Sequence, residues 1–202
     1  MPLDNFSVLP PVSDAITVVS GLPRSGTSMM MRMLDAGGMP ICSDNIRKAN
    51  EDNPNGYFEL EKIKQLDADA AWLQQEKGKA VKAISALLPM LPSDIFYYVI
   101  FMRRNMAEIL ASQKKMLQRR GVTNDEIPDA VMAAKYEKYL AATFRWIEKQ
   151  NHFKALYVHY HEVVQDPWRE AGRVNEFLQN RLDVGRMVEA VDPNLYRQRK
   201  HA

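Results

Sequence analysis

A glycine-containing segment near the N-terminus has the composition and spacing of a phosphate-binding loop. Residues 21–28 read Gly-Leu-Pro-Arg-Ser-Gly-Thr-Ser, between an apolar β-branched run at 15–20 and a stretch of helical character at 28–35. Glycines allow backbone N–H groups to wrap an anion, and the N-terminal end of a helix stabilises the bound negative charge. The segment therefore predicts a phosphate site, although a tight turn without a ligand would use the same glycines.

This loop lacks the lysine found in P-loops that bind nucleoside triphosphates. Thr27 occupies the position of that lysine, and Arg24 is the only cation inside the loop. The strongest predicted strand, 95–102, runs into Arg103 and Arg104 rather than into an aspartate that could hold a metal. A triphosphate needs the lysine and Mg²⁺ to balance its charge. A donor that brings one phosphate and one sulfate to the loop needs neither.

Residues 23–28 closely resemble the 5′-phosphosulfate loop of sulfotransferases, in which Pro, Lys or Arg, Ser, Gly, Thr and Thr or Ser occur in that order. Members of that family also carry a strand that ends in an arginine, with a serine eight residues later on the next helix, and these hold a 3′-phosphate. Here Arg104 follows the predicted strand, and Ser112 lies eight residues beyond it. Singly, Arg104 could be a solvated strand end and Ser112 a surface residue, but their order behind the loop supports the resemblance.

Two further stretches resemble the family more loosely. Residues 158–167 are similar to a family strand that ends in Tyr-Glu and is followed by Asp-Pro, but His161 separates Tyr160 from Glu162. Relatives close a basic segment near the C-terminus over the 3′-phosphate, and the tail 192–202 is basic without their Arg-Lys-Gly pattern. Its arginines either contact the cofactor or form a solvated terminus. These arginines are Arg197 and Arg199.

The resemblance covers about residues 16–178 and implies a donor, a product and a fold. The donor would be 3′-phosphoadenosine-5′-phosphosulfate (PAPS), the product adenosine 3′,5′-bisphosphate (PAP), and the fold a three-layer P-loop-type α/β architecture. The sulfuryl group would pass by in-line displacement to a hydroxyl or an amine. The expected donor-binding residues, besides the two tail arginines, are Pro23, Arg24, Ser25, Gly26, Thr27, Ser28, Arg104 and Ser112.

Two cations are candidates for work on the sulfuryl group itself. Arg24 lies in the loop, where it could meet the negative charge that develops on the bridging oxygen. Lys82 stands in an otherwise apolar run, so its charge needs an explanation. It could reach the sulfate, as a lysine in this region does in relatives, or extend from a sheet edge into water.

The candidate general base is a glutamate. Many cytosolic sulfotransferases use a histidine shortly after that lysine, but the first histidine of this chain is His152, which favours family branches that use glutamate. A turn rich in Asn, Pro and Gly at 53–56 leads to Glu59, our first choice, with Glu61 as the second. Glu59 could instead stabilise the first turn of a helix through its dipole.

The order of predicted elements indicates one α/β domain over residues 1–202 with a mostly parallel central sheet flanked by helices. Strands are expected at 15–20, 79–84, 95–102 and 155–160. Helices are expected at 28–35, 60–76, 105–118, 130–149, 168–178 and 184–191, and 44–57 reads as a surface loop. Residues 1–14 read as an irregular lead-in and 192–202 as a basic tail.

Composition limits the partners and the compartment. A net charge of +2 is too small to indicate nucleic-acid binding, and no apolar run approaches the length needed to span a bilayer. The N-terminus lacks a signal-peptide pattern, and a single cysteine fits a reducing compartment, so we expect a cytoplasmic protein. The four histidines and Cys42 form no metal-ligand pattern, which predicts that no metal is bound.

The acceptor is open at this point, and a small molecule, a carbohydrate or a peptide would be compatible with the motifs. Two other functions would share the loop. A P-loop kinase would need a magnesium site and the missing lysine. A nucleotide-binding domain without turnover would account for the absent histidine and the short chain.

Overall fold

The computed structural model describes residues 9–44, 46, 56–119, 121–122 and 127–195. Within them, five strands form one sheet in the order β2-β3-β1-β4-β5, and every neighbouring pair is parallel. The strands are β1 (Ile16–Gly21), β2 (Ile41–Cys42), β3 (Ala80–Lys82), β4 (Tyr97–Arg103) and β5 (Phe153–His159). β1 lies in the centre, between β3 and β4, so the loop at its carboxyl end opens where ligands bind in sheets of this kind.

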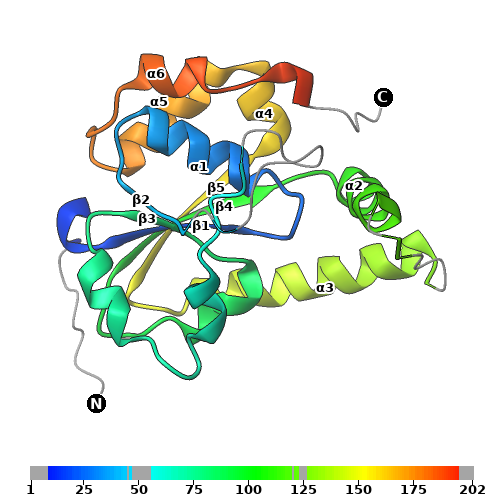
Figure 1. Ribbon diagram of the computed structural model, residues 1–202, viewed down its shortest axis with the longest axis horizontal. Helices are drawn as coiled ribbons and strands as arrows, with labels where there is room; N and C mark the ends of the chain where they lie inside the picture. Colours follow the sequence, from blue (N-terminus) through cyan, green and yellow to red (C-terminus); the bar gives the residue numbers. More distant parts are fainter. Residues whose placement is uncertain (1–8, 45, 47–55, 120, 123–126, 196–202) are drawn as a thin grey trace.

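Helices cover both faces of the sheet and complete the three expected layers (Figure 1). α1 (Thr27–Ala36), α4 (Tyr160–Gln165), α5 (Pro167–Phe177) and α6 (Val184–Glu189) lie above the sheet in that view. α3 (Asp129–Ile147) runs below it, and α2 (Met106–Arg119) lies at the end of the sheet where β4 leaves. Short 3-10 helices complete the chain: Val12–Asp14, Glu61–Gln65, Ala71–Glu76, Ser85–Met90 and Pro193–Leu195.

Two hydrophobic cores form because successive side chains of a strand point to opposite faces. Tyr98, Ile100 and Met102 of β4 join the core under α1, α5 and α6. The alternate residues of the same strand join the core over α3, where Phe101 packs edge-on against Phe144 with ring centroids 5.1 Å apart. A strand buried on both faces is continuously apolar, which is why the sequence signal of β4 was strong.

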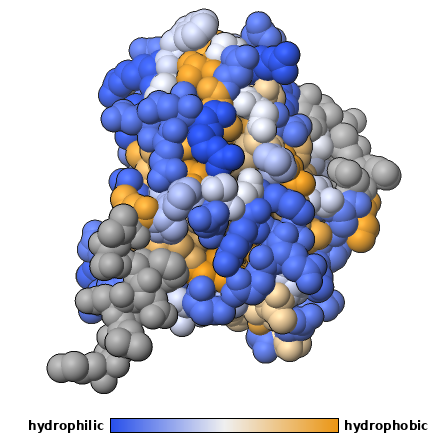
Figure 2. Space-filling view, turned by 90° about the vertical axis from the view of Figure 1, so that its left-hand side faces the viewer, coloured by the Kyte–Doolittle hydropathy of each residue, from blue (hydrophilic) through white to orange (hydrophobic). Residues whose placement is uncertain are grey.

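The outer face opposite the α2 end is mostly hydrophilic, with apolar residues in small separate patches (Figure 2). No helix among the described residues has the length and apolar character needed to cross a membrane.

The structure corrects two of the expected elements and adds one strand that was not expected. Residues 60–76 form two short 3-10 helices rather than one helix, because Asp69 interrupts the run: its side chain accepts from the amide of Ala71 at 3.0 Å and starts a new turn. The last strand ends at His159, and Tyr160 already belongs to α4. The sequence showed no sign of β2, whose two residues are too few to give a periodic pattern. Most of the expected loop at 44–57 falls outside the described residues.

The edge strand β2 can be tested through its cysteine, the only one in the chain. Burial, and then the hydrogen bond to Glu76 and its charge, raise the pKa of the Cys42 thiol to about 12. Because the thiolate is the reactive form, we expect iodoacetamide at pH 8 to alkylate folded protein roughly a hundredfold or more slowly than a free cysteine. The rate should return to that of a free thiol in guanidinium chloride. Fast labelling of the folded protein would contradict this packing of β2.

Candidate active site

The loop between β1 and α1 has the backbone of an anion cradle. Gly21, which ends β1, and Gly26, which caps α1, have φ values of 145° and 106°. A Cβ on Gly21 would come within 2.7 Å of the Met102 carbonyl oxygen, and one on Gly26 would collide with the ring of Tyr160. Arg24, between them, also has a positive φ of 75°. The loop therefore needs glycine at both positions to fold back against β4 and α4.

The chemistry of this cradle fits a phosphate. Gly26 provides no side-chain cap, and the first-turn N–H groups of α1 have no acceptor within the helix. Ser25 is 1% exposed, and its Oγ has no hydrogen-bond partner among the residues that the structure describes. A buried hydroxyl without a partner is costly, and a phosphate oxygen in the cradle would provide the missing acceptor. Thr27 is buried and Ser28 half-buried at the same helix end.

The two residues expected to hold a second phosphate lie directly beside this loop. Arg104 donates from its guanidinium to the backbone carbonyl of Arg24 at 3.2 Å. The Arg24 side chain in turn donates from Nε to Ser112 Oγ at 3.0 Å. Gln113 Nε2 adds a bond of 3.0 Å to the carbonyl of Pro23. β4 and α2 thus bring Arg104 and Ser112 together at the loop between β1 and α1.

Two side chains that hold Arg104 were not foreseen. Glu108, four residues along α2, accepts from Arg104 Nε at 2.9 Å, and both side chains are buried, 5% and 8% exposed. On the other side, the Arg104 guanidinium lies 4.5 Å from the ring centroid of Tyr160. The i,i+4 spacing of Arg104 and Glu108 was a usable signal on a predicted helix. The position of Tyr160 depends on how α4 packs, which local sequence does not encode.

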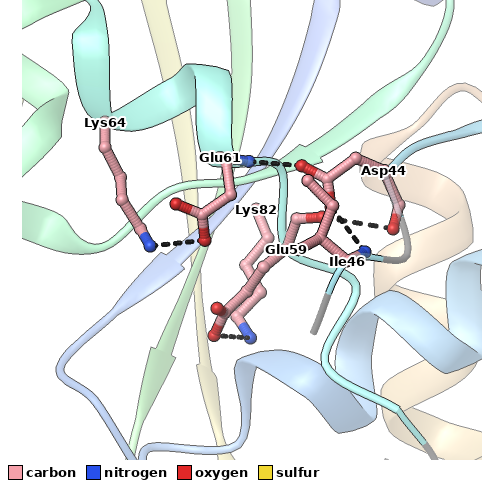
Figure 3. A network of polar contacts seen from close by, with 7 residues as sticks. Asp44, Ile46, Glu59, Glu61, Lys64 and Lys82 are labelled. Carbon is pink, nitrogen blue, oxygen red and sulfur yellow. Dashed lines mark hydrogen bonds and ion pairs between the residues drawn. The ribbon is translucent and has the colours of Figure 1, made fainter. Parts of the chain in front are cut away.

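The candidate catalytic residues Lys82 and Glu59 form a second group at the same loop. Lys82 Nζ donates to Ser28 Oγ at 3.0 Å and to the Tyr57 carbonyl at 2.7 Å, and it lies 3.6 Å from a carboxylate oxygen of Glu59. The Lys82 side chain is only 10% exposed. β2 pairs with Ala80 and Val81 of β3, and the ammonium of Lys82, the next residue, is hydrogen-bonded at the loop rather than extended into water. Figure 3 shows Lys82 facing Glu59.

Asp44 holds the segment that carries Glu59 (Figure 3). Its carboxylate accepts from the amide of Glu61 at 2.6 Å and from that of Ile46 at 2.9 Å, and its own amide donates to the Glu59 carbonyl at 3.2 Å. These amide donors lower the pKa of the Asp44 carboxyl. Glu61, the second candidate base, points elsewhere and pairs with Lys64 at 2.6 Å. We call these bonds of Asp44 to Ile46, Glu59 and Glu61 the Asp44 clamp. They hold the segment so that Glu59, and not Glu61, faces Lys82.

Some expected contacts lie outside the described residues, among them those of Arg197 and Arg199. Among the described residues, no group of three or more His, Cys, Asp or Glu side chains is arranged to hold a metal ion.

A family model, the sulfotransferase domain, matches residues 14–200. The chain belongs to the sulfotransferase domain family. The match spans nearly the whole chain and includes the loop at β1, both groups of side chains around it, and the tail. It decides against the P-loop kinase. No curated protein sequence matches this sulfotransferase significantly.

Solved structures similar to this sulfotransferase have low sequence identity and therefore inform on the fold. The sulfotransferase domain from the curacin biosynthetic pathway gives a TM-score of 0.51 at 16% identity, covering 92% of this chain and 79% of its own. Mouse sulfotransferase SULT7A1 complexed with PAP gives a TM-score of 0.51 at 16% identity, covering 96% of this chain and 66% of its own. Retinol dehydratase in complex with androsterone and inactive cofactor PAP gives a TM-score of 0.50 at 15% identity, covering 92% of this chain and 65% of its own. The present chain spans about two thirds of the length of the last two.

Substitution of Gly26 by alanine should test the cradle. The new Cβ would collide with the Tyr160 ring and hold a strained φ of 106°, so we expect a loss of about 1–3 kcal/mol in the free energy of unfolding. The control is Gly172→Ala, in α5, where a Cβ meets nothing within 4 Å. That variant should be neutral or slightly more stable. Chemical denaturation measures both, and equal stabilities would contradict the described loop.

Proposed function

We propose that this sulfotransferase takes its sulfuryl group from PAPS and transfers it to a hydroxyl or amine of an acceptor. One observation carries the proposal: the loop at β1 and the Arg104–Ser112 pair are adjacent and joined through Arg24. PAP carries phosphates on both the 5′ and 3′ positions of one ribose, and two neighbouring anion sites match that pattern. A donor with phosphates in one linear chain would not need the second site.

The loop residues would hold the 5′-phosphate. The amides at the start of α1 and the hydroxyls of Ser25, Thr27 and Ser28 are the donors, and the glycines admit the anion close to the backbone. Arg104 and Ser112 would hold the 3′-phosphate, with charge from the guanidinium and a neutral donor from the hydroxyl. Arg24 bonds to Ser112 in the structure, so we propose that it supports this second site as well as the bridging oxygen.

When bound, PAPS supplies a sulfuryl group whose bond to a phosphate oxygen breaks as the acceptor oxygen or nitrogen bonds to sulfur. The protein's part in such a transfer is positioning and charge stabilisation. Lys82, in contact with Ser28 at the loop, would neutralise charge on the sulfate and the leaving oxygen. Glu59, held 3.6 Å from Lys82, would accept the proton of the acceptor group.

For the whole protein we propose a small molecule, a carbohydrate or a peptide as acceptor, a single domain and a cytoplasmic location. The retinol dehydratase structure, which has a similar fold, is in complex with androsterone, and this supports a small molecule as one of the candidate acceptors. Acceptor choice in such a fold depends on the loops around the site.

Substitution of Arg104 by alanine should separate the two phosphate sites. We expect PAP affinity to fall about 10- to 100-fold, the effect of losing a hydrogen bond to a charged group, while affinity for adenosine 5′-monophosphate changes little. Isothermal titration calorimetry measures both. Because Glu108 would lose its partner, denaturation must first show that the variant is folded at the temperature used. Equal losses for both nucleotides would remove the 3′-phosphate assignment.

Substitution of Glu59 by glutamine should test the base. The amide cannot take up a proton, so transfer from radiolabelled PAPS to a panel of hydroxyl and amine acceptors should fall about 100-fold or more, with PAP affinity nearly intact. Glu61→Gln is the matched control, because Glu61 lies two residues after Glu59 on the same segment and its carboxylate pairs with Lys64 instead of Lys82. If the Glu59 and Glu61 variants keep the same rate, another residue is the base.

A further inference from the structure

We propose that Glu108 is a positioning residue for nucleotide binding: it holds the guanidinium of Arg104 in the orientation that selects a 3′-phosphate. This inference rests on the proposed function, because it concerns the site assigned there to the 3′-phosphate of PAP. Glu108 is a carboxylate beside a site that is expected to attract anions, so its presence there needs a physical reason.

Glu108 and Arg104 form a buried pair of opposite charges. Glu108 and Arg104 are 5% and 8% exposed at their side chains, with Oε2 and Nε 2.9 Å apart. A buried charge is tolerated when it is paired and hydrogen-bonded. Glu108 thus compensates for the cost of keeping Arg104 charged at a site shielded from water.

The guanidinium of Arg104 is restrained in its orientation. An arginine side chain has several rotatable bonds, so an unsupported guanidinium would lose much rotamer freedom on binding a phosphate. Here three contacts from three different elements restrain it: Glu108 of α2, the carbonyl of Arg24 in the loop, and the face of Tyr160 in α4. The contact from Glu108 uses Nε. A planar guanidinium can then present its outer N–H groups to a second anion.

Arg104 is also connected to the loop proposed to hold the 5′-phosphate. Arg104 bonds to the loop backbone at Arg24, and Tyr160, on which its guanidinium lies, also packs against Gly26. A guanidinium held in this way keeps a fixed distance from the loop. Glu108 therefore sets the spacing between the two anion sites, and this spacing lets a 3′,5′-bisphosphate fill both sites at once, whereas a 5′-monophosphate fills only the loop.

The test is the ratio of affinities for PAP and adenosine 5′-monophosphate, measured by calorimetry on the full chain. Glu108→Gln keeps an amide oxygen as acceptor for Arg104 Nε, whereas Glu108→Asp keeps the charge but is one methylene too short for the 2.9 Å contact. We expect the glutamine variant to keep most of the preference for PAP. In the aspartate variant, the ratio of the affinity for PAP to that for adenosine 5′-monophosphate should fall about tenfold. Both substitutions are conservative, so the comparison does not depend on a truncated variant that fails to fold.

Glu170→Gln and Glu170→Asp are the matched controls. Glu170 is a fully buried carboxylate of α5 that accepts from Arg173 at 2.6 Å, also within one helical turn. A merely structural role would make the two pairs of variants alike, with lower stability and an unchanged affinity ratio. The proposal expects the ratio to move only for Glu108→Asp.

Three results would overturn the proposal. An unchanged ratio in Glu108→Asp would show that Arg104 needs no such support. A higher affinity of Glu108→Gln for PAP would show that the carboxylate acts mainly by repelling the phosphate. An effect on both nucleotides alike would indicate general damage to the site. If instead the unaltered protein shows no preference for PAP, the proposed donor itself is wrong, which is a different and recognisable outcome.

Discussion

The contact between Arg104 and the backbone carbonyl of Arg24 is the interaction on which the site depends. It joins the end of β4 to the loop that follows β1, and so connects the two places that we propose as anion sites. β1 and β4 are adjacent and paired over the whole length of β1, with Gly21 beside Met102, so the two strands end within one residue of the same level. Side chains at the ends of two neighbouring parallel strands therefore lie close enough to contact the same ligand, as the proposed binding of PAP requires.

Packing around this contact explains why the loop contains the residues it does. Tyr160 lies between Gly26 and the guanidinium of Arg104, which leaves no room for a side chain at Gly26. On the opposite side, Lys82 reaches Ser28 from β3. The loop is thus held from α4 and from β3, and its amides are fixed before any ligand arrives. Preorganised donors of this kind lower the cost of binding and of charge stabilisation.

The clamp at Asp44 has a comparable effect on the proposed base. Glu59 and Glu61 are separated by one residue, yet one faces Lys82 and the other Lys64. The Asp44 carboxylate accepts from the Glu61 amide and the Asp44 amide donates to the Glu59 carbonyl, and these two bonds fix the segment in the conformation that makes this distinction. Phe58, between Tyr57 and Glu59, has a positive φ of 49°, a conformation that is uncommon for a residue with a side chain. Local strain is thus maintained where the carboxylate must be aimed.

Local patterns in the sequence were sufficient for the α/β class, four of the five strands and the glycine-containing turn between β1 and α1. These depend on short-range rules: continuous apolar runs for buried strands, glycines for the turn, and a fixed spacing from Arg104 to Ser112 along one strand and helix. Tertiary structure alone decided which side chains meet across the sheet. It placed Glu59 beside Lys82, Arg24 against Ser112 and Tyr160 under Arg104. Such contacts join residues far apart in the chain, and they follow from strand order and helix packing, which no local pattern specifies.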